Sequence, residues 1–443
     1  MLIDRVGPMD LTVLAADRAS VPMNTGAVIL FDGSAPAALF GLLHDRVPRV
    51  PRLRQTLRPT PPACGRPVWV DDPSFSLDQH FDLIERPCDD VFVLATSLLC
   101  RPFDVRRPLW RATLVTGRDR DALIVVLHHV VADGLGGLAV LSALADEWPG
   151  AGPGRPFPLR PPTARELASD ATRKRFHALR SLPGDLVRGV AGLRELGLGR
   201  VRPRMAERIS LVRPTSRRRA LAPVTIALDE VAAVAHRHGG TVNDVVLAAV
   251  TGGLLDVLRA RGEHPGHLIV SVPVSGRPSA DPDRLGNNTG VRPIAVPAIA
   301  DDGSRLAAIV AATREQRRSL VRAASAGPLG GVFRMLHRVG LFRVFIEHQR
   351  LVHTFETNVR GPAEALHLGG CRIGELVPMV ATAGNTGVTF AALSYAGALT
   401  VSVIADPVVV PEYDVLAAAV RRTFVTLARA EGYSPSPSRR GPA

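Results

Sequence analysis

Two adjacent histidines, followed by an aspartate and a glycine, are the residues of this chain best suited to chemistry. They are His128, His129, Asp133 and Gly134, within the heptapeptide HHVVADG. A neutral imidazole has a pKa near ~6.5, so it can accept a proton at cellular pH. The segment contains no cysteine, which excludes a thiol nucleophile there. The pattern predicts a histidine base; the alternative is one core histidine beside one solvated histidine.

The elements around the histidines place them at the end of a strand. The run Ala122–Leu127 is short, uncharged and rich in β-branched residues, which predicts a buried strand. Three glycines follow the heptapeptide's aspartate, and apolar residues then recur at helical spacing from Leu138 to Leu144. Glycine lets the backbone turn without a Cβ clash, so the motif occupies a strand–turn–helix.

Similar elements recur along the chain and divide it into parts. We predict an α/β lobe over residues 1–150, a basic helical connector over 151–221, a second lobe over 222–432 and a disordered tail over 433–443. In the first lobe we expect strands at Gly26–Phe31, Val68–Val70 and Ala112–Val115, and a helix at Pro36–Leu43 that begins with proline. In the second lobe we expect strands at Val224–Leu228, His267–Pro273 and Leu399–Ala405, and helices after Asp229-Glu230 and at Asn243–Arg261, Arg305–Ala324 and Tyr413–Gly432.

Charge is concentrated in the connector. Arg155–Arg219 holds 17 basic and 5 acidic residues, a net +12 of the chain's +13. An Arg-rich amphipathic segment is typical of contact with anionic lipid, although a solvated face or steering of a phosphate-bearing substrate would look the same. Nucleic acid is disfavoured, because aromatic residues make up only 5% of the chain and we find no recognition module.

Composition bounds the remaining possibilities. With 46% hydrophobic and 21% charged residues, the 443-residue chain can bury a large core. No run of eighteen apolar residues lacks a charge or histidine, so we expect no transmembrane helix, and the first five residues do not resemble a signal peptide. The spacing of the four cysteines fits neither zinc nor a disulfide framework. We therefore expect a cytoplasmic protein, with association at the inner face of the membrane as a further possibility.

Besides the heptapeptide, several other segments match the motifs of one protein family. They occur in the same order as in that family and extend over nearly the whole chain. They are Gly7-Pro8-Met9-Asp10, Arg107-Pro108-Leu109-Trp110, Thr241-Val242-Asn243-Asp244-Val245-Val246-Leu247-Ala248, Val272-Pro273-Val274-Ser275-Gly276-Arg277 with Gly286-Asn287-Asn288, Thr357-Asn358-Val359-Arg360-Gly361-Pro362, and Leu393-Ser394-Tyr395-Ala396-Gly397. Together with HHxxxDG, they resemble the bacterial wax ester synthase/diacylglycerol acyltransferases of the HHxxxDG superfamily. One departure is Arg360, which stands where the family's SNVPGP element usually has proline.

The resemblance implies a fold and a set of site residues. The fold would be two chloramphenicol-acetyltransferase-like, condensation-domain-like α/β lobes with an active-site tunnel between them. His129 would be the base and His128 would support the fold or orient its neighbour. Asp133 would be structural, and we choose Arg277 as its partner, the alternative being a surface arginine at a strand end.

We expect further residues to form the substrate-binding part of the tunnel. Each has a structural alternative: helix capping for Asn243 and Asp244, packing for Trp110, and a simple turn for Asn287. The expected substrate-binding residues are Gly134, Asn243, Asp244, Arg277, Asn287 and Trp110.

The function implied is transfer of a fatty acyl group from a CoA thioester to a lipid alcohol. With diacylglycerol the product would be triacylglycerol, and with a long-chain alcohol a wax ester. Acyl-CoA is then a substrate, and we expect no metal or redox cofactor. The alternatives are a tailoring acyltransferase for a specialised metabolite or amine, with a CoA- or carrier-bound donor, and a non-catalytic lipid-surface protein. The expected partners are acyl-CoA, a lipid alcohol and an anionic membrane or lipid droplet that the connector contacts.

Overall fold

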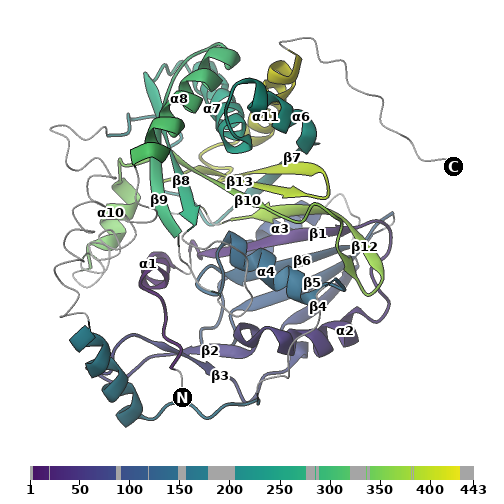
Figure 1. Cartoon of the computed structure of the whole chain (residues 1–443), viewed down its shortest axis with the longest axis vertical. Coiled ribbons are helices and arrows are strands. Elements are labelled where there is room, and N and C mark those ends of the chain that lie inside the picture. The colour runs from purple at the N-terminus through teal and green to yellow at the C-terminus, as the bar shows by residue number, and fades with distance from the viewer. Residues whose placement is uncertain are drawn as a thin grey trace.

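Two six-stranded sheets dominate the computed structural model of the chain (Figure 1). The structure describes residues 3–18, 20–85, 91–117, 119–147, 156–177, 205–275, 285, 289–319, 336, 340–380, 382 and 384–429. Arg277, Gly286, Asn287 and Asn288, most of the connector and the C-terminal tail lie outside these residues.

The first sheet has the strand order β11-β12-β1-β6-β5-β4, and only β4 and β5 run parallel. A separate hairpin pairs β2 with β3. The elements of this part are α1 (Pro8–Ala16), β1 (Asn24–Phe31), α2 (Leu39–Arg46), three short 3-10 helices (Val47–Arg49, Pro51–Arg54, Leu77–Gln79), β2 (Gln55–Arg58), β3 (Val68–Asp71), β4 (Phe81–Glu85), α3 (Val91–Leu99), β5 (Trp110–Thr116), β6 (Ala122–His128) and α4 (Gly134–Leu144).

The second sheet has the order β7-β14-β13-β10-β8-β9, with β10 parallel to both of its neighbours. Its strands come from residues 220–405. The elements of this part are β7 (Ala220–Ala227), α6 (Leu228–Arg237), α7 (Val242–Ala260), β8 (His267–Ser275), β9 (Thr289–Pro297), α8 (Asp302–Ser319), α10 (Phe342–His348), β10 (Thr354–Arg360), β11 (His367–Leu368), β12 (Cys371–Met379), β13 (Val388–Tyr395), β14 (Ala398–Ala405) and α11 (Tyr413–Arg429).

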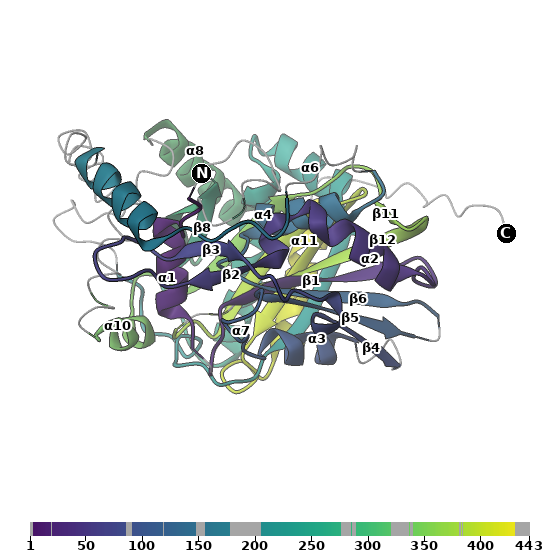
Figure 2. The same ribbon diagram turned by 90° about the horizontal axis from the view of Figure 1, so that it is seen from below.

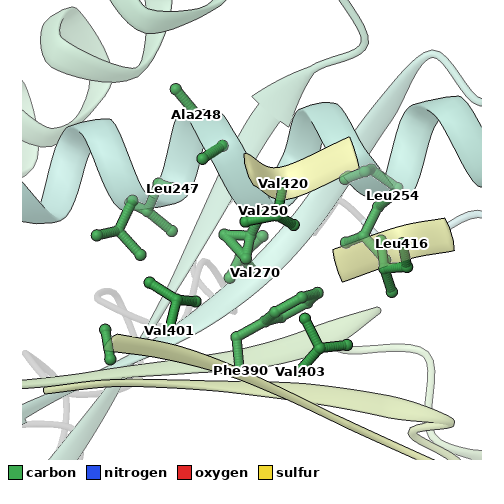
Figure 3. Close-up of a cluster of buried hydrophobic side chains, with 14 of the residues drawn as sticks. Leu247, Ala248, Val250, Leu254, Val270, Phe390, Val401, Val403, Leu416 and Val420 are labelled. Carbon is green, nitrogen blue, oxygen red and sulfur yellow. The ribbon is translucent and has the colours of Figure 1, made fainter. Parts of the chain in front are cut away.

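The second sheet is covered on one face by α7, α8 and α11. Helix α7 is buried along nearly its whole length, because it is apolar on every side, which is typical of a core helix. Its residues pack on β8, β13, β14 and α11 in the cluster of Figure 3, which labels Leu247, Ala248, Val250, Leu254, Val270, Phe390, Val401, Val403, Leu416 and Val420.

A strand from the second half of the chain completes the first sheet. Strand β12 pairs antiparallel with β1, from Gly26 opposite Met379 to Phe31 opposite Ile373. Helix α3 packs on one face of the first sheet, within a cluster that includes Leu221, Ala391 and Ile404 of the second sheet. The two lobes therefore share a core as well as a strand.

Three expected helix starts are wrong. Helix α8 begins at Asp302 instead of Arg305. Helix α2 begins at Leu39, because Pro36 lies in a turn and its carbonyl accepts the Leu39 amide. Helix α6 begins at Leu228, immediately after β7, so Asp229 and Glu230 lie in its first turn instead of capping it. The Leu228 amide is satisfied by the Gly397 carbonyl at 2.9 Å.

The described residues contain no single helix long and apolar enough to cross a membrane. Helices α6 and α7 meet that criterion only as a pair, and a 98° bend separates them.

Candidate active site

The two histidines lie where β6 ends, as expected. His128 is the last residue of β6 and lies opposite Asn24 of β1, and its amide donates to the Leu109 carbonyl at 2.9 Å. The His129 amide donates to the Met23 carbonyl at 2.7 Å. The backbone of the pair is therefore held by two separate segments of the first lobe.

The ring of His128 is buried and both of its nitrogens face protein groups. Its Nδ1 accepts the Val130 amide at 3.1 Å, so this nitrogen carries no proton. The proton then lies on Nε2, which is 3.4 Å from Oδ1 of Asp17. The side chain is 4% exposed. This geometry ties His128 to its neighbours, whereas His129 is only partly buried.

Asp133 caps the helix that follows the histidines. It is the N-cap residue of α4, and its Oδ1 accepts the Gly136 amide at 2.9 Å. A side-chain oxygen at this position satisfies one of the amides that the first helical turn leaves unpaired. This contact agrees with a structural role. The ion pair expected with Arg277 falls outside the described residues and stays a prediction.

Gly134 begins α4 at the point where the two lobes touch. A Cβ atom there would lie 2.7 Å from Cγ2 of Val359, in β10 of the second lobe. The glycine of the motif is thus required by a close approach between lobes, in addition to any role in the turn.

An apolar cavity of about 110 Å³ begins beside the motif. Helix α4 forms one side, strands β1, β5, β6 and β12 form another, and β10 and β13 of the second lobe form a third; α2, β11 and two of the 3-10 helices add further lining residues. Of the lining side chains that the structure describes, only those of Thr25, Trp110, Asp133 and Thr357 carry polar atoms. An environment of this kind favours an alkyl chain with one polar end near the motif.

The face that α4 turns to the cavity follows helical spacing. Its lining residues include Gly134, Gly137, Leu138, Leu141 and Leu144. Side chains three and four residues apart share one face of a helix, so these positions point the same way. A Cβ atom added at Gly137 would meet no atom within 4 Å, so this position is open.

The other predicted residues divide between the cavity and the scaffold. Trp110 lines the cavity, but its Nε1 donates to the Leu53 carbonyl at 2.7 Å and its ring stacks on His80, so it also packs. Asn243 and Asp244 lie at the start of α7 and are not among the cavity-lining residues that the structure describes. Asp244 forms a capping box with Thr241.

Several motif residues outside the cavity have clear structural tasks. The Asp10 carboxylate accepts the Gly7 amide at 2.9 Å at the start of α1. The Tyr395 hydroxyl donates to the Ile373 carbonyl and accepts the Leu366 amide, which fastens the β11–β12 hairpin. At Gly361 a Cβ would lie 2.4 Å from the Ser394 carbonyl oxygen. Arg360 is exposed at the end of β10 and is not among the described lining residues.

Two acidic residues were missed from sequence, one beside the histidines and one in the core under α7. Asp17 contacts His128, but it belongs to none of the recognised motifs. Glu356 directly precedes the Thr357-Asn358-Val359 element and is fully buried. Burial, with a smaller contribution from the charge of Asp244, raises the pKa of Glu356 to about 8. A carboxyl-bearing residue beside a recognised motif was the only available signal.

Comparison with known proteins agrees with this architecture. Solved structures with the same fold include a wax ester synthase/diacylglycerol acyltransferase from Marinobacter aquaeolei VT8, with a TM-score of 0.67 and 21% identity over 96% of this chain and 98% of that one. The first condensation domain of the calcium-dependent antibiotic synthetase gives a TM-score of 0.64 and 18% identity over 96% of both chains. The fold is therefore the two-lobed one of condensation domains and related acyltransferases.

Sequence comparison identifies the family, among the proteins with this fold, to which the chain is similar. The wax ester synthase/diacylglycerol acyltransferase catalytic domain matches residues 6–246, and the C-terminal domain of the same family matches residues 285–428. A "Probable diacyglycerol O-acyltransferase tgs1" of Mycobacterium tuberculosis strain H37Rv is 29% identical over 90% of this chain and 88% of its own length. The chain belongs to the wax ester synthase/diacylglycerol acyltransferase family. It is an O-acyltransferase of the type that uses acyl-CoA to esterify lipid alcohols.

Proposed function

We propose that this enzyme joins a fatty acyl group to diacylglycerol or a long-chain alcohol, with His129 as general base. His129 takes the hydroxyl proton as the hydroxyl oxygen attacks the thioester carbonyl. The tetrahedral intermediate then collapses, the C–S bond breaks, and the proton passes to the departing CoA sulfur. The products are an ester and free CoA, and no covalent enzyme intermediate is needed.

The observation that carries this assignment is the difference between the two histidines. His128 uses Nδ1 to accept the Val130 amide and turns Nε2 to Asp17, so a substrate proton could reach it only if one of these contacts broke. His129 lies one residue further along the same turn, ahead of the helix that forms the cavity wall. A positioned histidine of this kind contributes about 10²–10⁴-fold to rate.

The apolar cavity supports a fatty acyl donor. An alkyl chain in this space would contact leucine, valine and alanine side chains, at a gain of about 0.8 kcal/mol per buried methylene. Its carboxyl end would lie toward Asp133 and Gly134, which begin α4 beside the histidines.

Acyl transfer by the purified protein tests the assignment. Palmitoyl-CoA is offered with hexadecanol, with dioleoylglycerol or with no acceptor, while thiol release and lipid product are followed. We expect acceptor-dependent ester formation that falls about 10²–10⁴-fold in His129→Ala. The matched control is His44→Ala, since the His44 side chain is exposed on α2. Full activity of a folded His129→Ala enzyme would refute the base, and turnover with neither acceptor would favour a specialised acceptor.

We further propose that the helix over residues 164–177 contacts anionic membranes, from which lipid substrates come. Leu167 packs on the β2–β3 region and Asp170 pairs with Arg5 at 2.6 Å, which anchors this helix to the first lobe. Its far end exposes Phe176 (54%) beside Lys174 (49% of the side chain). Exposed basic and aromatic side chains on one helix are typical of an interfacial anchor.

Vesicle sedimentation tests the membrane contact. Each basic residue near an anionic surface contributes about 1 kcal/mol, so the double variant Arg173→Glu/Lys174→Glu should bind phosphatidylglycerol-containing vesicles at least about tenfold more weakly. Arg421→Glu/Arg422→Glu makes the same charge change on α11, at the opposite end of the molecule (Figure 1), and should bind normally. Equal binding by both double variants would rule out this helix as the contact.

A further inference from the structure

One carboxylate outside the recognised motifs connects the two segments that hold His129. Asp17 follows α1, and its amide donates to the Val13 carbonyl at the end of that helix. Its Oδ1 accepts the Met23 amide at 2.8 Å and lies 3.4 Å from Nε2 of His128. Both contacts are made by a single oxygen, so the Met23 segment and the His128 ring are held relative to each other.

His129 lies between these two contacts. Its amide donates to the carbonyl of Met23, the residue whose own amide Asp17 accepts. On its other side, the Val130 amide donates to Nδ1 of His128, the ring whose Nε2 faces Asp17. The backbone of His129 is therefore connected to Asp17 from both directions, in each case through one intermediate residue.

Electrostatics keep Asp17 in its charged form. Burial acts to raise the pKa of Asp17, but the hydrogen bond from His128 and the backbone amides of Met23 and Arg18 lower it below the usual value. A carboxylate is a stronger acceptor than a neutral oxygen, so it favours the tautomer of His128 with its proton on Nε2. That tautomer leaves Nδ1 available for the Val130 amide.

The segment that carries Asp17 is also attached to the second lobe. Arg18 forms an ion pair with Glu347 in α10, and α1 lies against α10 on one side of the molecule (Figures 1 and 2). The segment that carries Asp17 is thus held by the first lobe through β1 and β6 and by the second lobe through α10.

We propose that Asp17 is a positioning residue for the reaction, which fixes the His129 backbone through Met23 and through the tautomer of His128. The proposal rests on His129 being the base. Asp17 does not touch the substrate, and its effect is to keep the base in the geometry for proton transfer. A displacement of about 1 Å at a reacting group can cost on the order of 10²-fold in rate.

Steady-state kinetics of Asp17→Ala and Asp17→Asn test the proposal. For Asp17→Ala we expect kcat to fall on the order of 10- to 100-fold, with the KM for palmitoyl-CoA within about twofold, because the cavity is untouched. Asp17→Asn keeps an oxygen that can accept from both Met23 and His128, so it should recover most of kcat. It lacks the negative charge beside the histidines, so the acid limb of its pH–rate profile should move to lower pH.

The control is Asp10, a buried aspartate at the opposite end of the same helix. Asp10 caps the start of α1 by accepting the Gly7 amide, so Asp10→Asn should lower thermal stability without moving the pH–rate profile. Equal changes in Asp10→Asn and Asp17→Asn would overturn the proposal, as would wild-type kcat in Asp17→Ala. His129→Ala is measured in parallel: if it is inactive while Asp17→Ala is fully active, only the role of Asp17 fails.

Discussion

Glu356 should make the enzyme less stable as pH rises, and replacing it with glutamine should remove that effect. The residue lies in β10 opposite Phe390 of β13, in the sheet face covered by α7. It is 0% exposed, and neither of its carboxylate oxygens has a hydrogen-bond partner among the residues that the structure describes. Burial, and to a lesser extent the charge of Asp244, raises its pKa to about 8, from an ordinary 4.5.

The sign and size of the effect follow from proton linkage. Between pH 4.5 and about 8 the unfolded chain has released this proton while the folded chain retains it, so the folded state binds more protons. The free energy of unfolding then falls by about 1.4 kcal/mol for each pH unit in this interval. From pH 5 to pH 8 the loss is on the order of 4 kcal/mol, and above pH 8 it is complete.

Urea unfolding of Glu356→Gln and wild type at pH 5, 6.5 and 8 measures this difference. At pH 5 the two proteins should differ little, because both side chains are neutral in the fold. From pH 5 to pH 8, the free energy of unfolding of the variant minus that of wild type should increase by a few kcal/mol. The control is Glu364→Gln, which makes the same change at an exposed position and should show no pH trend. A difference for Glu356→Gln that is the same at pH 5 and pH 8 would refute the reasoning, since the folded carboxyl would then ionise normally.

Two substitutions on α4 test the cavity and the contact between lobes. Gly137→Leu should reduce kcat/KM for palmitoyl-CoA much more than for octanoyl-CoA, because the open position on the lining face becomes filled. Gly137→Ala should change the ratio of these two kcat/KM values little. An unchanged ratio in Gly137→Leu would place the acyl chain elsewhere. Gly134→Ala should lower both the activity and the unfolding midpoint, because its Cβ would lie 2.7 Å from Val359. The double variant Gly134→Ala/Val359→Ala should recover much of the loss. No recovery would exclude this clash as the cause.

Local patterns predicted most elements because they depend on neighbouring residues. The β-branched run before the histidines became β6, and the apolar helix after Thr241 became α7, which Thr241 caps. Asp133 follows the same local logic in the structure, where its carboxylate caps α4, although the sequence assigned its structural role only through the family resemblance. These features need no knowledge of the rest of the fold.

Long-range pairings were not predictable in this way. Strand β12 joins the first sheet beside β1, although Gly26 and its partner Met379 lie far apart along the chain. Periodicity shows that a strand has a buried face but does not identify its neighbour. For the same reason the sequence did not reveal Asp17 beside His128, or the burial of Glu356 under α7.

The pairing of β12 with β1 limits the ways in which substrates can reach the cavity. The second half of the chain holds α4 at both ends: Val359 contacts the start of the helix at Gly134, and the Asp146 carboxylate after its end accepts the amides of Gly369 and Gly370 in the β11–β12 turn. Separation of the lobes as rigid bodies would break the β1–β12 pairing, whose backbone hydrogen bonds would be left without partners. Entry of an acyl chain should therefore depend on local movement of α4 or α2, the helices that cover the cavity from the first lobe, while the histidines remain fixed by β6 and its neighbours.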